Sequence, residues 1–325
     1  MMMLASSRAI STKALQHVLS SSRAVHATHL IAPASVPSHN VHLNHQHLHQ
    51  TKHASSVPTR QFSSNVNHAQ PSIKLYQYHI CPFCNITKSA MQYAKLDYEA
   101  VEVNPLTKAE LKPWSDYKKV PIAIINNQQI NGSKDILNSI FNSPYVQEGL
   151  AKQWSNNNNN TTKEVMTIQQ FKESDTSKKW YRFASDDLGA VLYPNICGTI
   201  GDSFHAFDYV KNVDSFSPLQ KLSIQYVGSL AMYFAASKVK SKRNITDEKA
   251  ALQSALDKFE EEGLQNGALP FSSGNPTTPD LGDLAVFGVL YAIRDMNAHK
   301  DAVQNRGGVV KDWYERMEKI VVREQ

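Results

Sequence analysis

Cysteine is scarce in this chain of 325 residues, which contains only Cys81, Cys84 and Cys197. A secreted scaffold held together by disulfides needs more cysteines, and in pairs, so the composition excludes that class. Two of the three cysteines stand in a CxxC pattern. The low count and the pattern together indicate a protein of a reducing intracellular compartment.

Acidic residues are missing from the start of the chain, and the first of them is Asp97. Residues 1–70 contain five Lys and Arg residues and no acid, so the whole net charge of +5 lies in that segment. The remaining 29 basic residues balance the 29 acidic ones. The chain after residue 70 therefore has no net charge, and this gives no electrostatic reason to expect a nucleic-acid partner.

Long apolar runs are also missing, because no stretch approaches the ~18 consecutive apolar residues of a spanning helix. Residues 1–70 are instead rich in Ser and His with scattered cations, which is typical of a mitochondrial transit peptide. We therefore predict a disordered leader over 1–70 and mitochondrial localisation, with a peripheral membrane or cytoplasmic location as the alternative. The clustered histidines of the leader lack a framework to hold a metal, so no metal site is predicted.

The pattern of residues 71–145 predicts a small α/β domain of the thioredoxin type, with the element order β-α-β-α-β-β-α. Strands are expected at 73–78, 98–103, 120–125 and 128–130, and helices at 82–94, 105–114 and 133–141. That alternation implies a small sheet covered by helices.

The CPFC motif, Cys81 to Cys84, falls where the first strand should pass into the first helix. A cysteine at a helix start meets unpaired backbone N–H groups and the helix dipole, and both favour the thiolate. Pro82 suits the first helical position, because its missing N–H would have no partner there. Cys84, one turn further, could resolve a mixed disulfide formed at Cys81. Zinc is the alternative, but it needs two further ligands and no second CxxC exists.

Two further signals fit the same site. Pro121 would open a central strand, where proline is disfavoured, and a cis bond there would turn the backbone of Val120 toward Cys81. Ser133, which follows Gly132, could cap the last helix of the domain and leave free N–H groups for an anion. Together these positions describe glutathione, with its sulfur at Cys81, its cysteinyl backbone at Val120 and its γ-glutamyl carboxylate at Ser133. A simple turn at Val120–Pro121 and a simple cap at Ser133 are the alternative.

The rest of the chain divides into an Asn-rich linker over 146–178 and an all-α domain over 179–325. Helices are expected at 179–192, 198–210, 218–239, 246–262, 284–293 and 313–321. Asp280 and Asp283 resemble a capping box at the start of a buried helix. The aromatic residues of this domain, and Cys197, are expected to lie in its core.

Six sequence blocks in order carry a resemblance that is more specific than CxxC alone. They are LYQY (Leu75 to Tyr78), CPFC (Cys81 to Cys84), VEVNP (Val101 to Pro105), KVPI (Lys119 to Ile122), FDYV (Phe207 to Val210) and DLAVFGVL (Asp283 to Leu290). A thioredoxin-like domain followed by a helical one resembles the glutathione transferases. The blocks themselves resemble the family of membrane-associated prostaglandin E synthases of type 2, over about Ile73 to Val321 with a break at the linker.

That resemblance implies a homodimeric, glutathione-binding isomerase that converts the endoperoxide prostaglandin H2 to prostaglandin E2. Cys81 would carry the thiolate, and Tyr78 and Phe83 would flank it in the substrate pocket. Val120 and Ser133 would hold glutathione. The family can also bind haem together with glutathione, and that form degrades the endoperoxide instead.

The chain departs from the family's pattern in two places. The family carries an acid just before the glutathione-binding serine, whereas this chain has Gly132, so the amino group of glutathione loses a partner unless Asp135 reaches it. Gly132 and Pro121 are kept among the glutathione-binding candidates beside Ser133 and Val120. No membrane anchor is visible, which favours mitochondrial targeting over membrane association.

Two other functions stay open. A glutathione-dependent thiol–disulfide oxidoreductase or transferase would use Cys81 as well, but dithiol chemistry would also need Cys84. A glutathione- or haem-binding module would need no catalysis at all. A fold hosts many functions, so the site itself has to decide between them.

Overall fold

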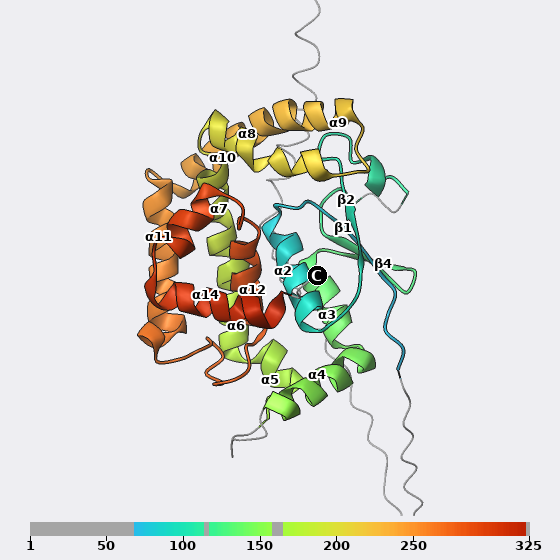
Figure 1. The fold of residues 1–325 in the computed structure, drawn as a ribbon, viewed down its shortest axis with the longest axis vertical. Coiled ribbons are helices and arrows are strands. Elements are labelled where there is room, and N and C mark those ends of the chain that lie inside the picture. The colour runs from blue at the N-terminus through green and yellow to red at the C-terminus, as the bar shows by residue number, and fades with distance from the viewer. Residues whose placement is uncertain (1–67, 114–116, 158–164, 323–325) are drawn as a thin grey trace, which may run out of the picture.

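The computed structural model of the chain describes residues 68–113, 117–157 and 165–322. The predicted leader lies outside these ranges except for its last three positions, as does part of the asparagine run. The described chain forms a four-stranded sheet with its own helices and a larger layer of helices packed against them (Figure 1). This is the predicted fold class, a thioredoxin-like domain followed by a helical domain.

The sheet has the strand order β2-β1-β3-β4. Its strands are β1 (Ile73–Gln77), β2 (Glu99–Glu102), β3 (Ile122–Ile125) and β4 (Gln128–Asn131). β1 pairs in parallel with β2 and antiparallel with β3, which pairs antiparallel with β4. The parallel pair needs a crossover, which a helix supplies, whereas β3 and β4 need only a short turn. Asn126 and Asn127 make that turn at φ 48° and 67°, a region that asparagine tolerates.

Side chains of the sheet alternate between two apolar clusters. Ile73 and Leu75 belong to the main core on the side of the helices. Tyr76 points to the opposite face and packs with Ile122 and Ile124 in a smaller cluster. Both faces of the sheet are therefore covered, and β1 is buried along almost its whole length.

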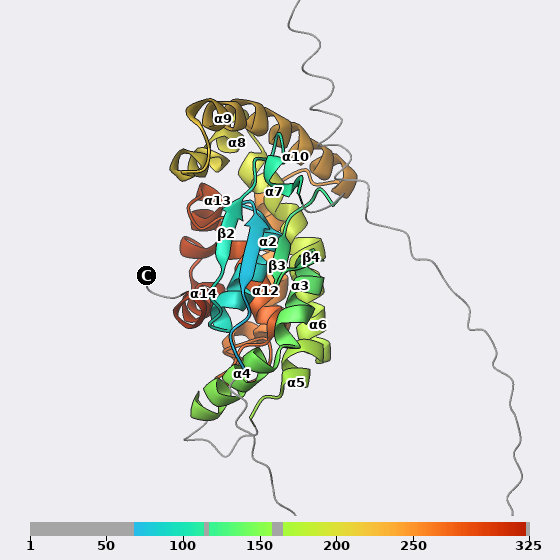
Figure 2. The same ribbon diagram turned by 90° about the vertical axis from the view of Figure 1, so that its right-hand side faces the viewer.

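Helices α2 (Pro82–Tyr93) and α3 (Ser133–Phe141) pack on the sheet, and Figure 2 shows them behind its strands. Helix α12 (Leu281–Tyr291) of the helical layer packs on the outer side of α2. Gly288 permits this close approach, because a Cβ atom there would lie 2.7 Å from the backbone N and Cα of Ile86. Helix α2 is thus held between the sheet and the helical layer.

The helical layer comes from the second half of the chain. Its other helices are α6 (Asp175–Arg182), α7 (Gly189–Cys197), α8 (Ile200–Ala206), α9 (Pro218–Ser223), α10 (Ser229–Arg243), α11 (Glu248–Lys258), α13 (Asn297–His299) and α14 (Gly308–Val321). Its core is aromatic: Phe259 meets both Trp180 and Trp313 edge to face, at 4.9 and 4.8 Å between ring centroids. No helix in the described ranges is both long and apolar enough to cross a membrane.

Short non-α turns interrupt or join these helices. π-Helical turns lie at 183–188, 224–228, 259–263 and 300–304, and 3-10 turns lie at 109–111, 208–212 and 265–267. Three of the π-helical turns continue directly from a preceding α-helix that the sequence predicted as part of one longer helix. The sequence pattern therefore identified the helical segments but not these local changes in winding.

The predicted capping box at the start of α12 is confirmed. Asp280 Oδ1 accepts from the backbone N of Asp283 (3.0 Å), and Asp283 Oδ2 accepts from the backbone N of Asp280 (3.2 Å). The buried Asp283 carboxylate also accepts from the backbone N–H groups of Ser272 and Ser273 and from Trp313 Nε1. One carboxylate thus joins three segments of the helical layer.

The structure differs from the sequence prediction in the expected linker, where it places α4 (Pro144–Asn157) and α5 (Ile168–Glu173). An apolar stripe at a spacing of four residues explains α4, because Val146, Leu150 and Trp154 are all buried. The polar asparagines that follow it dominate the composition of the segment and conceal this stripe.

Trp154 anchors α4 to the first domain. Its Nε1 donates to the hydroxyl of Tyr93 at the end of α2 (2.8 Å), and its ring packs on Phe171 of α5 at 5.5 Å between centroids. Both contacts are fully buried. The segment between the two domains is therefore part of the core at both of its ends.

The end predicted at residue 192 for the helix 179–192 is wrong, because α7 runs on through Pro194 to Cys197. Proline lacks the N–H that would bond to the carbonyl one turn back. The side chain of Asn195 does not replace that bond but ties the same turn to a neighbouring helix, since its Nδ2 donates to the carbonyls of Val191 (2.8 Å) and Glu248 (2.7 Å). These two hydrogen bonds, one within α7 and one to α11, hold the chain in helical conformation past the proline.

The helix predicted at 105–114 is also wrong, since the described part holds only a 3-10 turn at Ala109–Leu111. The side chain of Asn104 explains the difference. Its Oδ1 accepts from the backbone N–H groups of Leu106 (2.9 Å) and Thr107 (3.2 Å), which forms a local turn. Such side-chain bonds compete with helix formation.

Candidate active site

The chain makes a tight turn after β1 that positions Cys81. The backbone N of Cys81 donates to the carbonyl of Tyr78 (3.1 Å), and Cys81 becomes the N-cap of α2 with Pro82 at its first turn. The backbone N–H of Cys84 donates to Cys81 Sγ (3.5 Å), so sulfur takes the place of the usual capping oxygen. Cys81 is 8% exposed and Cys84 is completely buried. Cys81 is therefore the cysteine of the pair that a substrate meets.

Hydrogen bonding and burial give the two thiols opposite tendencies. The Cys84 thiol, with the backbone N–H groups of Cys84 and Phe83, lowers the pKa of Cys81 although burial opposes this. The ammonium group of Lys88, one turn beyond Cys84, acts in the same direction. Burial, followed by the neighbouring Cys81, raises the pKa of Cys84. Cys81 therefore loses its proton more readily than Cys84.

Three tyrosines surround the thiols from different parts of the chain. Tyr78 comes from the turn before α2, Tyr117 from the loop before β3 and Tyr193 from α7. Burial raises the pKa of all three, and the nearby thiols raise it further. Aromatic rings and tyrosine hydroxyls therefore lie around the thiols together with the ammonium group of Lys88.

A partly buried polar cluster supports the turn that leads into Cys81. Glu102, at the end of β2, accepts from the backbone N of His79 (2.8 Å) and from Gln77 Nε2 (3.2 Å), and it bonds to Tyr209. Burial raises the pKa of Glu102 to about 7. The ring of His79 stacks on Tyr209 and its Nε2 lies 3.2 Å from Arg294 Nη2. Residues from the sheet and the helical layer thus fix this turn together.

The loop before β3 meets the start of α3 beside this site. The Val120–Pro121 peptide bond is cis, and the carbonyl of Pro121 accepts from the backbone N of Gly132 (2.9 Å). Gly132 has φ 84° and ψ 149°, a conformation that other residues rarely adopt. Ser133 begins α3 and is buried, with its Oγ 3.4 Å from the hydroxyl of Tyr181 in α6. Unpaired N–H groups at such a helix start favour an anion.

Similar proteins fall into one superfamily. Residues 75–145 match the family model of the glutathione S-transferase N-terminal domain. Prostaglandin E synthase 2 of Mus musculus is 29% identical over 278 residues, which cover 77% of this chain and 70% of that protein. Prostaglandin E synthase 2 of Danio rerio is 30% identical over 272 residues, which cover 76% of this chain and 70% of that protein. The chain belongs to the prostaglandin E synthase 2 family.

Solved glutathione transferases are more distant from this member of the prostaglandin E synthase 2 family. Glutathione transferase F7 of Populus trichocarpa has a TM-score of 0.42 at 15% identity, with 76% of this chain and 93% of that chain covered. A second, glutathione transferase F1 of poplar with a serine-to-cysteine change, has a TM-score of 0.44 at 12% identity, with 78% and 94% covered.

The residues predicted for a prostaglandin E synthase 2 site lie in two groups. Cys81, Cys84 and Tyr78 meet at the start of α2, where Phe83 is partly exposed and contributes its backbone N–H. The second group comprises Val120, Pro121, Gly132 and Ser133, which meet where the loop before β3 joins α3. Within the described residues, no cluster of three or more His, Cys, Asp or Glu side chains could hold a metal ion.

Several residues of the candidate site in this prostaglandin E synthase 2 family member were not predicted from the sequence. Lys88 was detectable, because it lies four residues after Cys84 and so on the same side of α2. Tyr117, Tyr193 and Glu102 carried no local signal, since each reaches the thiols only through the fold. The CPFC motif therefore indicated the centre of the candidate site, whereas the residues around it come together only through tertiary packing.

The Cys84 thiol donates a hydrogen bond to Cys81. Replacing Cys84 by alanine removes the thiol that most lowers the pKa of Cys81, so the pKa of Cys81 is expected to rise. The measurement is the rate of iodoacetamide alkylation of Cys81 against pH, read by peptide mass spectrometry. The alkylation midpoint should move to higher pH in the variant.

Cys197 supplies the internal control for this titration. It is completely buried, and burial raises its pKa to about 11, so it should remain unmodified near neutral pH in both proteins. An alkylation midpoint of Cys81 that stays unchanged in the Cys84→Ala variant would show that the backbone N–H groups alone set its pKa.

Proposed function

We propose that the chain is a glutathione-binding isomerase that converts prostaglandin H2 to prostaglandin E2 at Cys81. The observation that carries the proposal is the thiolate-favouring position of Cys81 at the start of α2, beside the hydroxyls of Tyr78 and Tyr193. The relatives named prostaglandin E synthase 2 support the choice of substrate.

The proposed reaction needs no net oxidant. The Cys81 thiolate attacks one oxygen of the O–O bond, which forms an S–O bond and releases the other oxygen as an alkoxide that takes up a proton. Removal of the proton from the carbon that bears the S–O oxygen then forms the ketone, and the S–O bond breaks to return the thiolate. The neutral hydroxyls of Tyr78 and Tyr193 are suited to donate to the developing alkoxide.

Glutathione fits the second half of the site. The start of α3 at Ser133 offers N–H groups to a carboxylate, and the backbone of Val120 makes no hydrogen bond to another described residue. Asp135 lies in the first turn of α3, and its charge raises the pKa of both Tyr117 and Tyr181. A carboxylate for the amino group of glutathione is thus present two residues after Ser133 and three after Gly132. When bound, glutathione would supply a second sulfur near Cys81.

Haem is supported less well. The imidazole of His79 is engaged by stacking on Tyr209 and by contact with Arg294, and His205 pairs with Asp208 at 2.7 Å. These histidines do not fit the role of a free axial ligand. A Soret absorbance that appears only with glutathione is the observation that would support the haem-binding alternative.

A thiol–disulfide oxidoreductase is the second candidate function, because Cys84 lies one turn behind Cys81 as a resolving cysteine would. Its burial and raised pKa make it a poor second thiolate in the reduced protein. The two candidates differ in their need for Cys84, which only dithiol reduction requires.

The test is prostaglandin H2 turnover by the full chain, with the products identified by mass spectrometry. The wild type should form prostaglandin E2 faster than the spontaneous reaction, Cys81→Ser should fall to the spontaneous rate, and Cys84→Ser should retain turnover. Equal rates for the wild type and Cys81→Ser would sink the isomerase proposal. Reduction of a glutathione mixed disulfide that is lost in Cys84→Ser would then support the oxidoreductase.

We also propose a homodimer, which an exposed apolar helix face supports. One continuous helical segment, from α9 into α10, exposes Leu219, Leu222, Tyr226, Leu230 and Phe234 by 45–77% at spacings of three and four residues. Such a stripe on a surface helix is typical of an interaction surface. Sedimentation of the full chain as a monomer would contradict the homodimer.

We also propose a mitochondrial location. A fluorescent fusion that stays outside mitochondria would contradict it.

A further inference from the structure

Asn85 lies near the start of α2, one residue after Cys84, and is completely buried. Its side-chain Nδ2 donates to two backbone carbonyls, those of His79 (2.8 Å) and Cys81 (2.9 Å). The bond to Cys81 reaches back four residues along the helix, whereas the bond to His79 reaches beyond the helix into the turn after β1. One side-chain amide therefore joins α2 to the turn that leads into Cys81.

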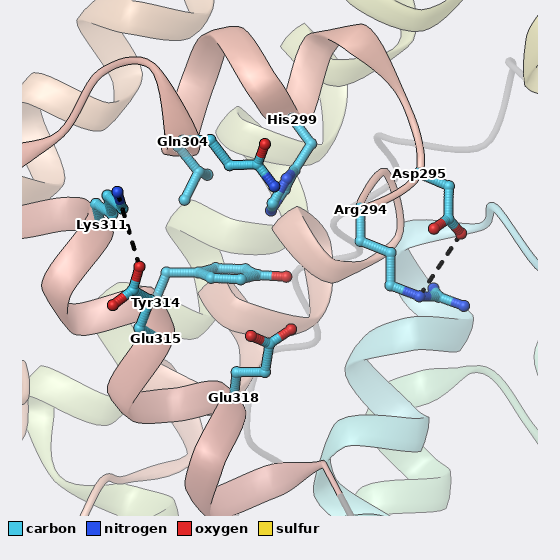
Figure 3. Close-up of a pocket in the computed structure, with 9 residues that line it drawn as sticks. Arg294, Asp295, His299, Gln304, Lys311, Tyr314, Glu315 and Glu318 are labelled. Carbon is cyan, nitrogen blue, oxygen red and sulfur yellow. Dashed lines mark ion pairs between the residues drawn. The ribbon is translucent and has the colours of Figure 1, made fainter.

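His79 is held from two other sides as well. Its backbone N donates to Glu102 Oε1 at the end of β2 (2.8 Å). Its ring stacks on Tyr209, and its Nε2 lies 3.2 Å from Nη2 of Arg294, which follows α12. Figure 3 shows Arg294 at the edge of a pocket in the helical layer, where its Nε pairs with Asp295 at 3.7 Å. The N–H, the carbonyl and the ring of His79 are thus each fixed by a different part of the fold.

Stability alone is a weak reason for an asparagine at position 85. The Oδ1 atom of Asn85 is buried and has no hydrogen-bond partner among the described residues, and an unpaired buried acceptor destabilises a fold. Asparagine also favours a helix less than alanine does. These two costs offset the gain from the bonds that Nδ2 makes. The shape of the turn that Asn85 holds is therefore the better reason for it.

That turn determines where the Cys81 sulfur lies. The backbone N of Cys81 donates to the carbonyl of Tyr78 (3.1 Å), and His79 lies within the turn that this bond closes. The Cys81 sulfur accepts from the backbone N of Cys84 at 3.5 Å. The Cys84 thiol and the first backbone N–H groups of α2 lower the pKa of Cys81. Hydrogen bonds weaken steeply as their geometry worsens, so a small movement of the turn would weaken this effect.

We infer that Asn85 positions the Cys81 thiol by holding the carbonyl of His79. No other hydrogen bond to that carbonyl occurs in the part of the chain that the structure describes. Asn85 does not touch the reacting sulfur, so it is a positioning residue and not a catalytic one. The inference rests on Cys81 as the reactive thiol of the proposed function, and not on the identity of the substrate.

The test compares two substitutions of Asn85 in the full chain. Asn85→Ala removes both bonds. Asn85→Ser keeps one, because a serine in a helix can donate to the carbonyl four residues back, as Thr87 does to Phe83 (3.0 Å), but it cannot reach His79. Both variants should move the pH midpoint of Cys81 alkylation by iodoacetamide upward by at least ~0.5 units, read by peptide mass spectrometry. Prostaglandin H2 turnover should fall several-fold near pH 7 and recover above the new midpoint.

Thr87→Val is the matched control, because it also removes a buried side-chain bond to a backbone carbonyl, but one that lies wholly within α2. Its Cys81 midpoint should equal that of the wild type, and thermal unfolding followed by circular dichroism checks that every variant is folded. The titratable groups near Cys81 are the same in all variants: Tyr78, Cys84, Lys88, Tyr117, Tyr193 and Tyr209.

Three results would each overturn the role of Asn85. They are an unchanged midpoint in Asn85→Ala, a wild-type midpoint in Asn85→Ser, and an equal shift in Thr87→Val. If the wild type itself does not turn over prostaglandin H2, the function proposed above fails, and the alkylation midpoints still decide whether Asn85 positions Cys81.

Discussion

Replacing Asp283 by alanine is expected to lower the free energy of unfolding by about 3–5 kcal/mol, as when a buried polar network loses its acceptor. The Asp283 carboxylate accepts from four buried donors, namely the backbone N–H groups of Ser272 (2.9 Å), Ser273 (3.3 Å) and Asp280 (3.2 Å) and Trp313 Nε1 (3.2 Å). Alanine satisfies none of them. Urea unfolding followed by circular dichroism measures the loss, which is a large part of the ~5–15 kcal/mol that stabilises a typical domain.

Asp280→Asn is the control for this network. Burial and the neighbouring Asp283 raise the pKa of Asp280 to about 8, so near pH 7 its side chain is mostly protonated and resembles asparagine in charge and shape. The amide oxygen still accepts from the backbone N of Asp283. The change in unfolding free energy should stay below about 1 kcal/mol. A similarly small change in Asp283→Ala would show that the network contributes little.

Replacing Gly288 by alanine is expected to destabilise the protein by about 1–3 kcal/mol through overpacking. The added Cβ would lie 2.7 Å from the N and Cα of Ile86 and 2.9 Å from the carbonyl carbon of Asn85. These are backbone atoms of α2, so no side chain can rotate away to make room. Separation of α12 from α2 would also disturb the turn that positions Cys81. The same urea titration measures the loss, and alkylation of Cys81 reports the displacement.

Gly149→Ala is the matched control, with the same chemical change inside another helix. A Cβ at Gly149 in α4 would meet no heavy atom within 4 Å. Alanine favours a helix over glycine by ~0.5–1 kcal/mol, so this variant should be more stable than the wild type. If both substitutions had the same sign, helix propensity rather than the contact with Ile86 would determine the result.

Features encoded within a few residues could be predicted from the sequence. Cys81 at a helix start and the Asp280–Asp283 capping box each follow from a local pattern, and the structure has both. Local patterns also failed where a nearby side chain intervened, as Asn104 does for the helix expected after it and Asn195 does at Pro194. In each case a side-chain amide bonds to the backbone, and hydrophobic periodicity carries no information about that bond.

Contacts between distant segments could not be predicted in the same way. Tyr193 of α7 lies close enough to the thiols for them to raise its pKa, and Tyr181 reaches Ser133 from α6. A tyrosine ring suits a core position as well as a site position, and the sequence indicates the core for both residues. The imidazole of His299 has no hydrogen-bond partner among the described residues, and this too was undetectable, because pairing depends on the fold and not on the neighbours in sequence.

The contact between Trp154 and Phe171 fixes two points of the chain, one on each side of the asparagine run. Where the two ends of a segment are fixed, doubling its length costs only about 0.6 kcal/mol in closure entropy. Insertions and deletions within the run are therefore expected to leave the stability of the protein nearly unchanged, as long as both anchoring aromatics are kept.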